Sequence, residues 1–366
     1  MGFNLGIVGL PNVGKSTLFN ALTSTAAAQT ANFPFCTIEP NVGRVAVPDP
    51  RLEKISAIAK SQKITPTQLE FVDIAGLVKG ASQGEGLGNQ FLSHIREVDA
   101  VIHLVRCFAD EEVSHVSGTV NPLDDAEIIE TELLVADLDS VERRVPSLEK
   151  KARGGDREAK DLLPLMERVL AGLREGRPAR ETEVSADERK AFRGLQLLTS
   201  KPLLYVCNVE EDSAATGNAL SEAVAVRAAE TGAETAVISA RIEAEVAELE
   251  DPEERGSYLE SLGLEETGLA KVIHAGYRLL DQITFFTAGP KETRAWTVKR
   301  GAAAPEAAGA IHTDFERGFI RAETIAYEDF VELGGEQAAK EAGKMRSEGR
   351  DYTVKDGDVI LFRFNV

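Results

Sequence analysis

The feature that most constrains this chain is an eight-residue segment near its start, Gly9-Leu10-Pro11-Asn12-Val13-Gly14-Lys15-Ser16. Two glycines separated by four residues and followed directly by Lys and Ser match the pattern of a phosphate-binding loop. The apolar run 5–8 before it predicts a buried strand, and residues 16–22 predict the first turns of a helix. Helix N-termini favour phosphate because their unpaired N–H groups carry partial positive charge. Lys15 could then reach the β- and γ-phosphates and Ser16 could ligate Mg²⁺. The alternative is an ordinary glycine-rich turn.

Composition narrows the class of protein. The 366 residues, 43% hydrophobic and 28% charged, predict a globular chain of two or three domains. A net charge of −19 argues against binding naked nucleic acid over the whole surface, so we expect no DNA partner. No apolar stretch approaches the ~20 residues of a membrane span, and Cys36, Cys107 and Cys207 lack metal-type spacing. We therefore expect a cytoplasmic protein with no membrane partner.

The order of apolar runs predicts the domain organisation. Residues 1 to about 130 alternate short apolar runs, including 69–73 and 101–105, with helical patterns, as in a mostly parallel sheet flanked by helices. Helical spacing then predicts two long antiparallel helices, inserted at about 130–200, before further strands at 203–207 and 236–238.

A second composition change near residue 278 predicts a small, mainly β domain. Residues 283–287 and 294–298 are rich in β-branched and aromatic residues, and Asp356-Gly357 predicts a turn between strands at 352–354 and 359–362. The alanine-rich stretch 302–310 is interpreted as a loop. We expect domains at 1–277 and 278–366.

Three further features fit the switch elements of a nucleotide-binding domain. Asp73-Ile74-Ala75-Gly76 follows a predicted strand and resembles an Asp-x-x-Gly element, whose carboxylate holds Mg²⁺ through water and whose glycine N–H senses the γ-phosphate. Gly84, Gly86 and Gly88 lie in a segment suited to ordering with that phosphate, or in a plain surface loop. Thr37 stands where a switch threonine would close over Mg²⁺, or is a turn residue between prolines.

The segment Asn208-Val209-Glu210-Glu211 bears on the choice of base. GTP-binding switches usually have Asn-Lys-x-Asp after this strand, and the Asp accepts two hydrogen bonds from guanine. Here Val209 replaces the Lys and Glu211 replaces the Asp, and the longer side chain crowds the guanine 2-amino group. Losing such an acceptor costs roughly 1–3 kcal/mol, so we predict a preference for adenine. Alternatively, Asn208 only caps the strand end and the base contacts lie elsewhere.

Together these motifs resemble the Obg-like ATPase family, the YchF proteins, over essentially the whole chain. The resemblance implies an Obg-type domain that prefers ATP, a coiled-coil insertion, and a C-terminal TGS domain of β-grasp form. It also implies that Asn12, Val13, Gly14, Lys15, Ser16 and Thr17 line the phosphates, that Ser16 and Thr37 hold Mg²⁺, and that Val209 touches the base through its backbone. Family members are associated with ribosomes, which makes the ribosome or its large subunit the expected partner of a monomer.

Hydrolysis needs a group that orients water. The position after Asp-x-x-Gly, often Gln in switches, is Leu77, which cannot hydrogen-bond. The resemblance makes His115 the candidate, since a neutral imidazole could orient the water; otherwise His115 is a packing or surface residue.

The leading hypothesis is therefore an ATP-hydrolysing switch, with Lys15, Mg²⁺ and the loop amides stabilising the transferred phosphate. Two alternatives stay open. One is a GTPase of the same superfamily, and the other is a ribosomal adaptor gated by nucleotide. Residues 140–180 contain 11 Lys and Arg but only 7 Asp and Glu. This local positive charge favours a large ribonucleoprotein partner, or is simply a solvated helical face.

Overall fold

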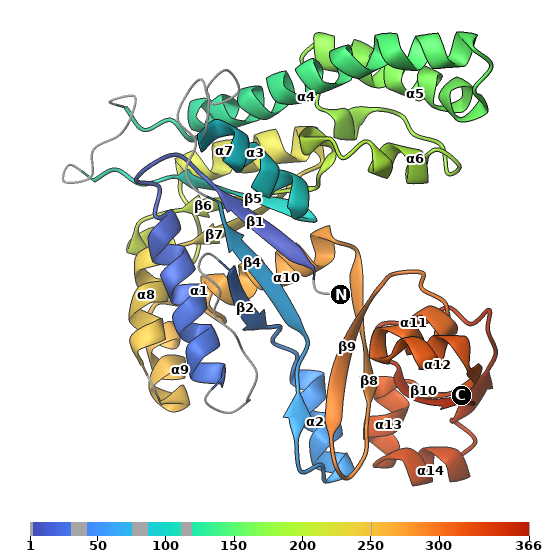
Figure 1. Ribbon diagram of the computed structural model, residues 1–366. Helices are drawn as coiled ribbons and strands as arrows, with labels where there is room; N and C mark the ends of the chain where they lie inside the picture. The colour runs from blue at the N-terminus through green and yellow to red at the C-terminus, as the bar shows by residue number, and fades with distance from the viewer. Residues whose placement is uncertain (1–2, 31–41, 75–86, 111–118, 250, 366) are drawn as a thin grey trace. The chain divides into compact units, whose positions relative to one another are not determined.

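The computed structural model describes residues 3–30, 42–74, 87–110, 119–249 and 251–365 (Figure 1). The chain divides into two compact units. The nucleotide unit comprises Asn4–Gly43 and Glu70–Ala275, and the C-terminal unit comprises Met1–Phe3, Arg44–Leu69 and Gly276–Val366. The C-terminal unit thus takes residues 44–69 from the part of the chain that the sequence assigned to the nucleotide-binding domain.

The nucleotide unit is built on a six-stranded sheet with the strand order β2-β4-β1-β5-β6-β7. The strands are β1 (Asn4–Val8), β2 (Val42–Ala46), β4 (Gln68–Asp73), β5 (Ala100–Arg106), β6 (Leu203–Asn208) and β7 (Glu234–Ile238). β1 pairs in parallel with β4 and β5, and β6 pairs in parallel with β5 and β7. Every residue of β5 and β6 is buried, as expected for parallel strands covered on both faces. The strands predicted at 69–73, 101–105, 203–207 and 236–238 are confirmed.

Helices flank this sheet. They are α1 (Lys15–Thr30), α3 (Leu87–Glu97), α7 (Ala219–Thr231), α8 (Ala240–Glu248), α9 (Pro252–Ser261) and α10 (Gly268–Leu279). α1 packs beside α8. The predicted α/β architecture with a helix directly after the glycine-rich segment is confirmed.

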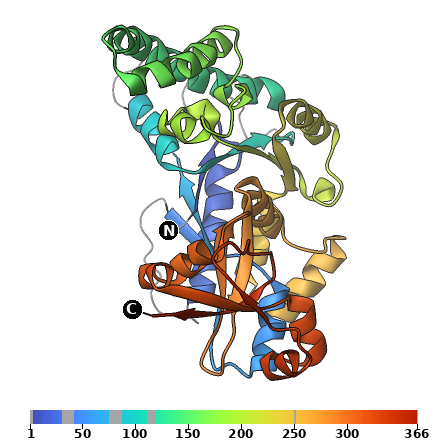
Figure 2. The ribbon, with the colours of Figure 1, turned by 90° about the vertical axis from the view of Figure 1, so that its right-hand side faces the viewer.

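A helical arm is inserted between β5 and β6. Its long helices α4 (Pro122–Arg153) and α5 (Arg157–Arg174) lie side by side away from the strands (Figures 1 and 2). The turn between them uses Gly155 at φ +96, a left-handed conformation that suits glycine, and Asp156 caps α5. The helices share an apolar core that includes Val141, Leu165 and Val169. The predicted helical insertion is confirmed.

The end of the arm nearest the sheet is held by a buried carboxylate. Short helices η1 (Ala179–Glu181), α6 (Arg189–Gly194) and η2 (Leu198–Ser200) lead back to β6. Asp137 of α4 accepts hydrogen bonds from Leu198 N at 2.9 Å, Thr199 N at 2.8 Å and Thr199 Oγ1 at 2.7 Å. These bonds fix the returning chain against α4.

The C-terminal unit contains a second sheet with the order β11-β10-β12-β8-β9-β3. Its strands are β3 (Ile64–Thr65), β8 (Gln282–Thr287), β9 (Thr293–Lys299), β10 (Phe319–Ile325), β11 (Arg346–Glu348) and β12 (Val359–Phe364). β8 and β9 pair antiparallel, which confirms the two strands predicted at 283–287 and 294–298.

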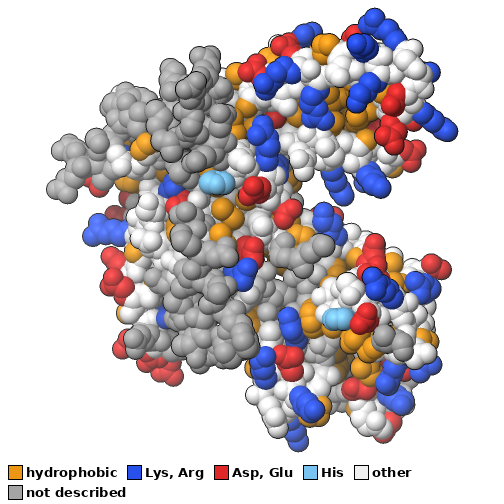
Figure 3. All heavy atoms as spheres, viewed as in Figure 1, with side chains coloured by type: hydrophobic (Ala, Val, Ile, Leu, Met, Phe, Trp, Pro, Cys, Tyr) orange, Lys and Arg blue, Asp and Glu red, His pale blue; other side chains and the backbone are white. Residues whose placement is uncertain are grey.

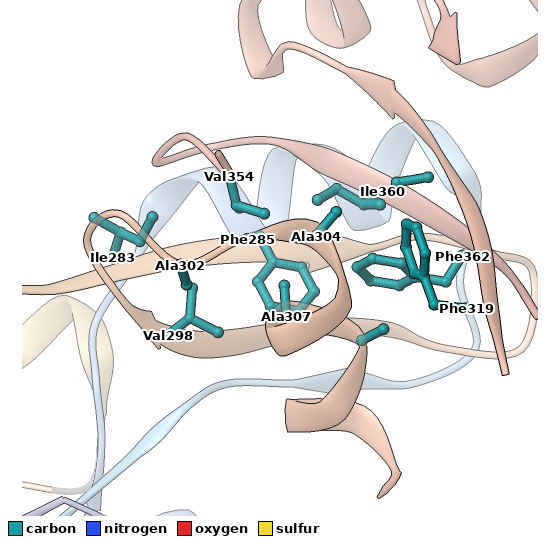
Figure 4. Packing of buried hydrophobic residues seen from close by; sticks show 12 residues of the cluster. Ile283, Phe285, Val298, Ala302, Ala304, Ala307, Phe319, Val354, Ile360 and Phe362 are labelled. Atoms are coloured by element: carbon teal, nitrogen blue, oxygen red, sulfur yellow. The ribbon is translucent and has the colours of Figure 1, made fainter. Parts of the chain in front are cut away.

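Helices cover both faces of this second sheet. They are α2 (Pro50–Ala59), α11 (Ala304–Ile311), α12 (Thr313–Arg317), α13 (Tyr327–Leu333) and α14 (Glu336–Glu341). One apolar cluster places Phe285 and Phe362 against Ala304 and Ala307 of α11 (Figure 4). A second cluster joins Phe286 to residues of α2, α13 and α14.

Two expectations for the C-terminal unit were wrong. The stretch 302–310 is mostly the helix α11, whose alanines pack closely on the sheet. The N–H of Ala303, the residue before the helix, donates a hydrogen bond to the Glu306 carboxylate. The predicted turn at Asp356-Gly357 and the strand after it are present, but the strand predicted at 352–354 is not. Residues 352–354 make only an isolated bridge, Ala303 to Thr353, and β12 pairs instead with β10 and β8.

Among the described residues, no helix is long and apolar enough to cross a membrane.

Candidate nucleotide site

The glycine-rich loop joins the carboxyl end of β1 to the first residue of α1. Asn12 and Gly14 both have positive φ, 64° and +94°, so the chain turns sharply before Lys15 begins the helix. A Cβ on Gly9 would lie 2.8 Å from the Leu104 carbonyl oxygen, and one on Gly14 would collide with the Asn208 side chain. The space available therefore requires both glycines, and the left-handed backbone torsion is a second reason for glycine at position 14. The side chains of Asn12, Ser16 and Thr17 are exposed at this helix N-terminus.

The loop lysine is paired with the aspartate of the second motif. Lys15 Nζ forms a short ion pair with Asp73 Oδ1, and the two side chains are only 13% and 19% exposed. Asp73 ends β4 and stands beside Ile7 of β1, which brings it under the loop. In this arrangement the Asp73 carboxylate pairs with the Lys15 ammonium group, which would otherwise face phosphate.

The oxygen donors beside the loop fit a hard divalent cation. The Ser16 hydroxyl and the Asp73 carboxylate are ligands of the type that Mg²⁺ prefers. No group of three or more His, Cys, Asp or Glu side chains that could hold a metal occurs among the described residues. A cation here would therefore complete its shell with water and with oxygens of the nucleotide. Thr37 and Gly76 lie outside the described residues, as does most of the glycine-rich segment that contains Gly84 and Gly86.

Asn208 connects the loop to a neighbouring helix. Its Nδ2 donates to the Val13 carbonyl at 3.0 Å, and its Oδ1 accepts from Ala240 N at 2.8 Å. The side chain is 4% exposed. It therefore has a structural role, as in the alternative that the sequence left open, because it links the loop to the N-terminus of α8.

The residues after Asn208 lie beside the start of α8. Val209 is buried and its N–H donates to the Ile238 carbonyl at 2.9 Å. Glu211 begins a short 3₁₀ turn (Glu211–Ser213), and its Oε1 is 2.6 Å from Arg241 Nε. Glu210 instead accepts from Asn218, the N-cap of α7.

The sequence analysis missed Ser239-Ala240-Arg241. This tripeptide joins β7 to α8, with Ser239 at the N-cap position, and it supplies both the N–H bonded to Asn208 and the cation paired with Glu211. The available signal was a serine directly between a predicted strand and an amphipathic segment.

The predicted site residues that the structure describes gather at one edge of the sheet. They are Asn12, Val13, Gly14, Lys15, Ser16 and Thr17 of the loop and α1, Asp73 of β4, Asn208 of β6, and Val209 and Glu211 after it. β1 has β4 on one side and β5 on the other, so the loop stands where the connections diverge to the two halves of the sheet, the usual ligand position in such folds. His115 lies outside the described residues.

A glycine-rich loop at this position, with a lysine and an aspartate beside it, defines a P-loop nucleotide-binding domain of the GTPase type. A family model described as a 50S ribosome-binding GTPase matches residues 4–136. A model of the C-terminal region of YchF GTPases, described as a protein of unknown function, matches residues 282–365.

Full-length relatives place the chain more narrowly. The ribosome-binding ATPase YchF of Escherichia coli O157:H7 is 58% identical over 366 residues, and that of Bacillus subtilis (strain 168) is 54% identical over 368; each match covers both proteins fully. The structure of the Schizosaccharomyces pombe YchF GTPase has a TM-score of 0.89 and 37% identity, covering 99% of this chain and 98% of that one. The chain belongs to the YchF family.

Proposed function

We propose that this protein is a Mg²⁺-dependent, ATP-hydrolysing switch that binds ribosomes in the cytoplasm. The observation that carries the proposal is the loop between β1 and α1, whose glycines and adjoining Lys15 form an anion site beside Asp73. The family supports it, since bacterial relatives identical at more than half of their positions are named ribosome-binding ATPases.

In the proposed reaction, the loop N–H groups hold the phosphates and Lys15 exchanges Asp73 for the β- and γ-phosphate oxygens. Bound Mg²⁺ would supply charge neutralisation across those phosphates, with Ser16 and Thr37 as its ligands. Asp73, released from Lys15, would then orient a water of the ion, and Gly76 would bond the γ-phosphate. Asn12 and Thr17 would complete the phosphate contacts.

Phosphate release with and without Mg²⁺ tests this chemistry. We expect Lys15→Ala to lose turnover because the ammonium group of the loop is removed, whereas a change at the exposed Lys190 of α6, Lys190→Ala, should match the wild type. Equal turnover in the two variants would contradict the assignment.

For the attacking water we propose His115, and His115→Ala should lower turnover while leaving ATP affinity intact. Unchanged turnover would remove His115 from the mechanism. Turnover of the wild type below about one per hour would favour the adaptor alternative, since an unstimulated switch hydrolyses at about 3–5 × 10⁻⁴ s⁻¹, or about one to two per hour.

For the base we propose adenine, with Val209 contacting it through the backbone, Asn208 contacting it at its edge, and Glu211 rejecting guanine. Two features support this preference. Glu211 is longer than the aspartate that guanine needs, and its carboxylate is already engaged by Arg241 at 2.6 Å. A guanine would have to displace that pairing, whereas adenine has no N–H group at the corresponding position.

We propose that the arm makes one of the contacts with the ribosome, and that this contact is with the large subunit. Basic side chains are spread over the arm among acidic ones (Figure 3), and Lys150, Lys151 and Arg153 are exposed at the end of α4. Such a patch can contact RNA phosphates even in an acidic protein. Among the described residues, Arg153 alone of the three forms an ion pair, with Glu149 at 2.9 Å.

Ribosome pelleting at two salt concentrations tests this contact. We expect reversal of Lys150, Lys151 and Arg153 to Glu to weaken pelleting and its salt dependence. Reversal of the exposed Lys54, Lys60 and Lys340 changes net charge equally and is the matched control. Equal losses in both variants would mean that only overall charge matters, and no loss would return the arm to a solvated surface.

A further inference from the structure

A second cavity lies in the nucleotide unit, between one face of the sheet and the base of the arm. Its volume is about 300 Å³. Its floor includes Val101 and Leu203 of the central strands, and one wall is formed by residues 127–134 of α4. The opposite wall is the chain returning from the arm, from Gly176 to Lys201. Lys15, Asp73 and Asn208 do not line it, so it is separate from the nucleotide site.

The size and lining of this cavity are those of a ligand site. The pocket is open to solvent at exposed lining residues such as Thr131, and its volume is at the lower end of the range of small-molecule sites, which start at roughly 300 Å³. The walls are mainly aliphatic, from Val101, Ile129, Leu133 and Leu203, with a few charged groups among them. A mainly apolar pocket with a few converging polar groups is the usual form of such sites.

Two buried donors at the cavity have no partner. The Nε–H groups of Arg180 and Arg227 are buried without a hydrogen bond in the described part of the chain. Both arginines line the cavity. Arg180 in addition forms no ion pair with a carboxylate of the described residues, so its guanidinium is the cation of the lining that an outside acceptor can pair. A guanidinium edge matches a carboxylate in shape and charge.

The charge around the cavity points to a single negative charge on the occupant. Three cations, Arg180, Lys201 and Arg227, face two carboxylates, Glu127 and Glu130. Glu130 is already held by Arg227 Nη2 at 3.0 Å and by the Tyr205 hydroxyl. Lys201 donates to the carbonyls of Arg96 and Val98. Arg180 has no such carboxylate partner among the described residues, and the lining side chains together carry one net positive charge.

His103 does not alter this balance. It lies on the cavity floor, 2% exposed, and burial lowers its pKa to about 4, so the imidazole is neutral near pH 7. A phosphate dianion would leave an uncompensated charge in a mainly aliphatic space, whereas a monocarboxylate would not.

We propose that this cavity binds a small amphipathic monocarboxylate, with the carboxylate on Arg180 and the apolar body between α4 and the sheet. The occupant would contact both the central strands and the segment that attaches the arm, and so would stabilise the base of the arm. The site is independent of the ATP chemistry proposed above.

The probe is 4-phenylbutyrate, compared with the uncharged 4-phenylbutanol, titrated into the full chain and followed by calorimetry and ligand-observed NMR. We expect the acid to bind at least tenfold more tightly than the alcohol. Arg180→Met keeps an apolar stem and should lose that tenfold advantage. Arg177→Met, an exposed arginine three residues away that is paired with Glu175, is the matched control and should behave as the wild type.

A second variant guards against misfolding of the first. Thr131 is exposed and lines the cavity, so Thr131→Trp should block entry of both ligands while leaving the circular dichroism spectrum unchanged. Equal affinity for acid and alcohol, an undiminished affinity in Arg180→Met, or no binding of the acid at millimolar concentration would each overturn the proposal.

Discussion

Asn208 provides the sharpest test of how the fold holds the nucleotide loop. Its side chain is the link between two buried backbone groups, the Val13 carbonyl and the Ala240 N–H, at 3.0 and 2.8 Å. Asn208→Ala leaves both groups without a partner in a place that water does not reach, since the residue is 4% exposed. Leaving one buried group unpaired costs about 1–3 kcal/mol, so the variant, which leaves two, should lose about 2–6 kcal/mol of stability.

The same substitution should weaken ATP binding. Without Asn208, the loop between Val13 and Lys15 is no longer fixed to α8, and its N–H groups must be ordered by the ligand itself. We expect the Kd for ATP to rise at least tenfold, together with faster hydrogen exchange in peptides covering 9–18 and 239–248. Urea unfolding followed by circular dichroism gives the stability change, and calorimetry gives the affinity.

Asn218→Ala is the matched control. Asn218 also joins two parts of the nucleotide unit, because it caps α7 and its Nδ2 donates to the Cys107 carbonyl at 2.7 Å. Its loss should lower stability by about 1–2 kcal/mol without the same effect on the nucleotide loop. If Asn208→Ala were as stable as the wild type, or if both variants bound ATP equally well, the clamp described for Asn208 would be refuted.

Three other outcomes follow from the described contacts. Asp137→Ala removes the acceptor of three buried hydrogen bonds, so the arm base should lose about 3 kcal/mol and show faster exchange at 197–200, unlike a change at the exposed Asp139. Burial lowers the pKa of His103 from 6.5 to about 4. The free energy of unfolding that this neutral imidazole contributes is therefore complete above pH 6.5, and it is lost as the pH falls towards 4, because the unfolded chain takes up the proton first. The loss is at most about 3 kcal/mol. In His103→Gln the urea midpoint should fall less between pH 7 and 5 than it does in the wild type, and an equally steep fall in the two proteins would contradict this role of His103. Arg241→Ala frees the Glu211 carboxylate and should narrow the preference for ATP over GTP several-fold, whereas Glu245→Ala should not, as measured by competition binding.

The nucleotide loop and its sheet could be predicted from sequence because their signals are local. The glycines and the Lys15–Ser16 pair have fixed spacing, and the apolar runs that form β1 and β6 end at the loop and at Asn208. The arm could be predicted for the same reason, since its helices keep helical spacing on either side of Gly155.

Other features depend on contacts between residues far apart in the chain. Ile64 and Thr65 pair with Thr293 and Arg294, so no local pattern assigns residues 44–69 to the C-terminal unit. The helix α11 was mistaken for a loop because its alanines are buried only by close packing on β8 and β12, which no local pattern shows. Arg241 enters the site through an ion pair with Glu211, thirty residues before it, and the sequence offers no spacing rule for such a pair.

The central claim, that the segment from Asn208 to Glu211 selects adenine, is tested most directly by equilibrium binding of ATP and GTP in the presence of Mg²⁺. The wild type and Glu211→Asp should be compared at the same protein concentration. The account predicts a clear preference for ATP in the wild type, weakened or reversed when the shorter carboxylate restores room for the guanine 2-amino group. Equal or tighter binding of GTP by the wild type would contradict it and would make the GTPase reading the better one.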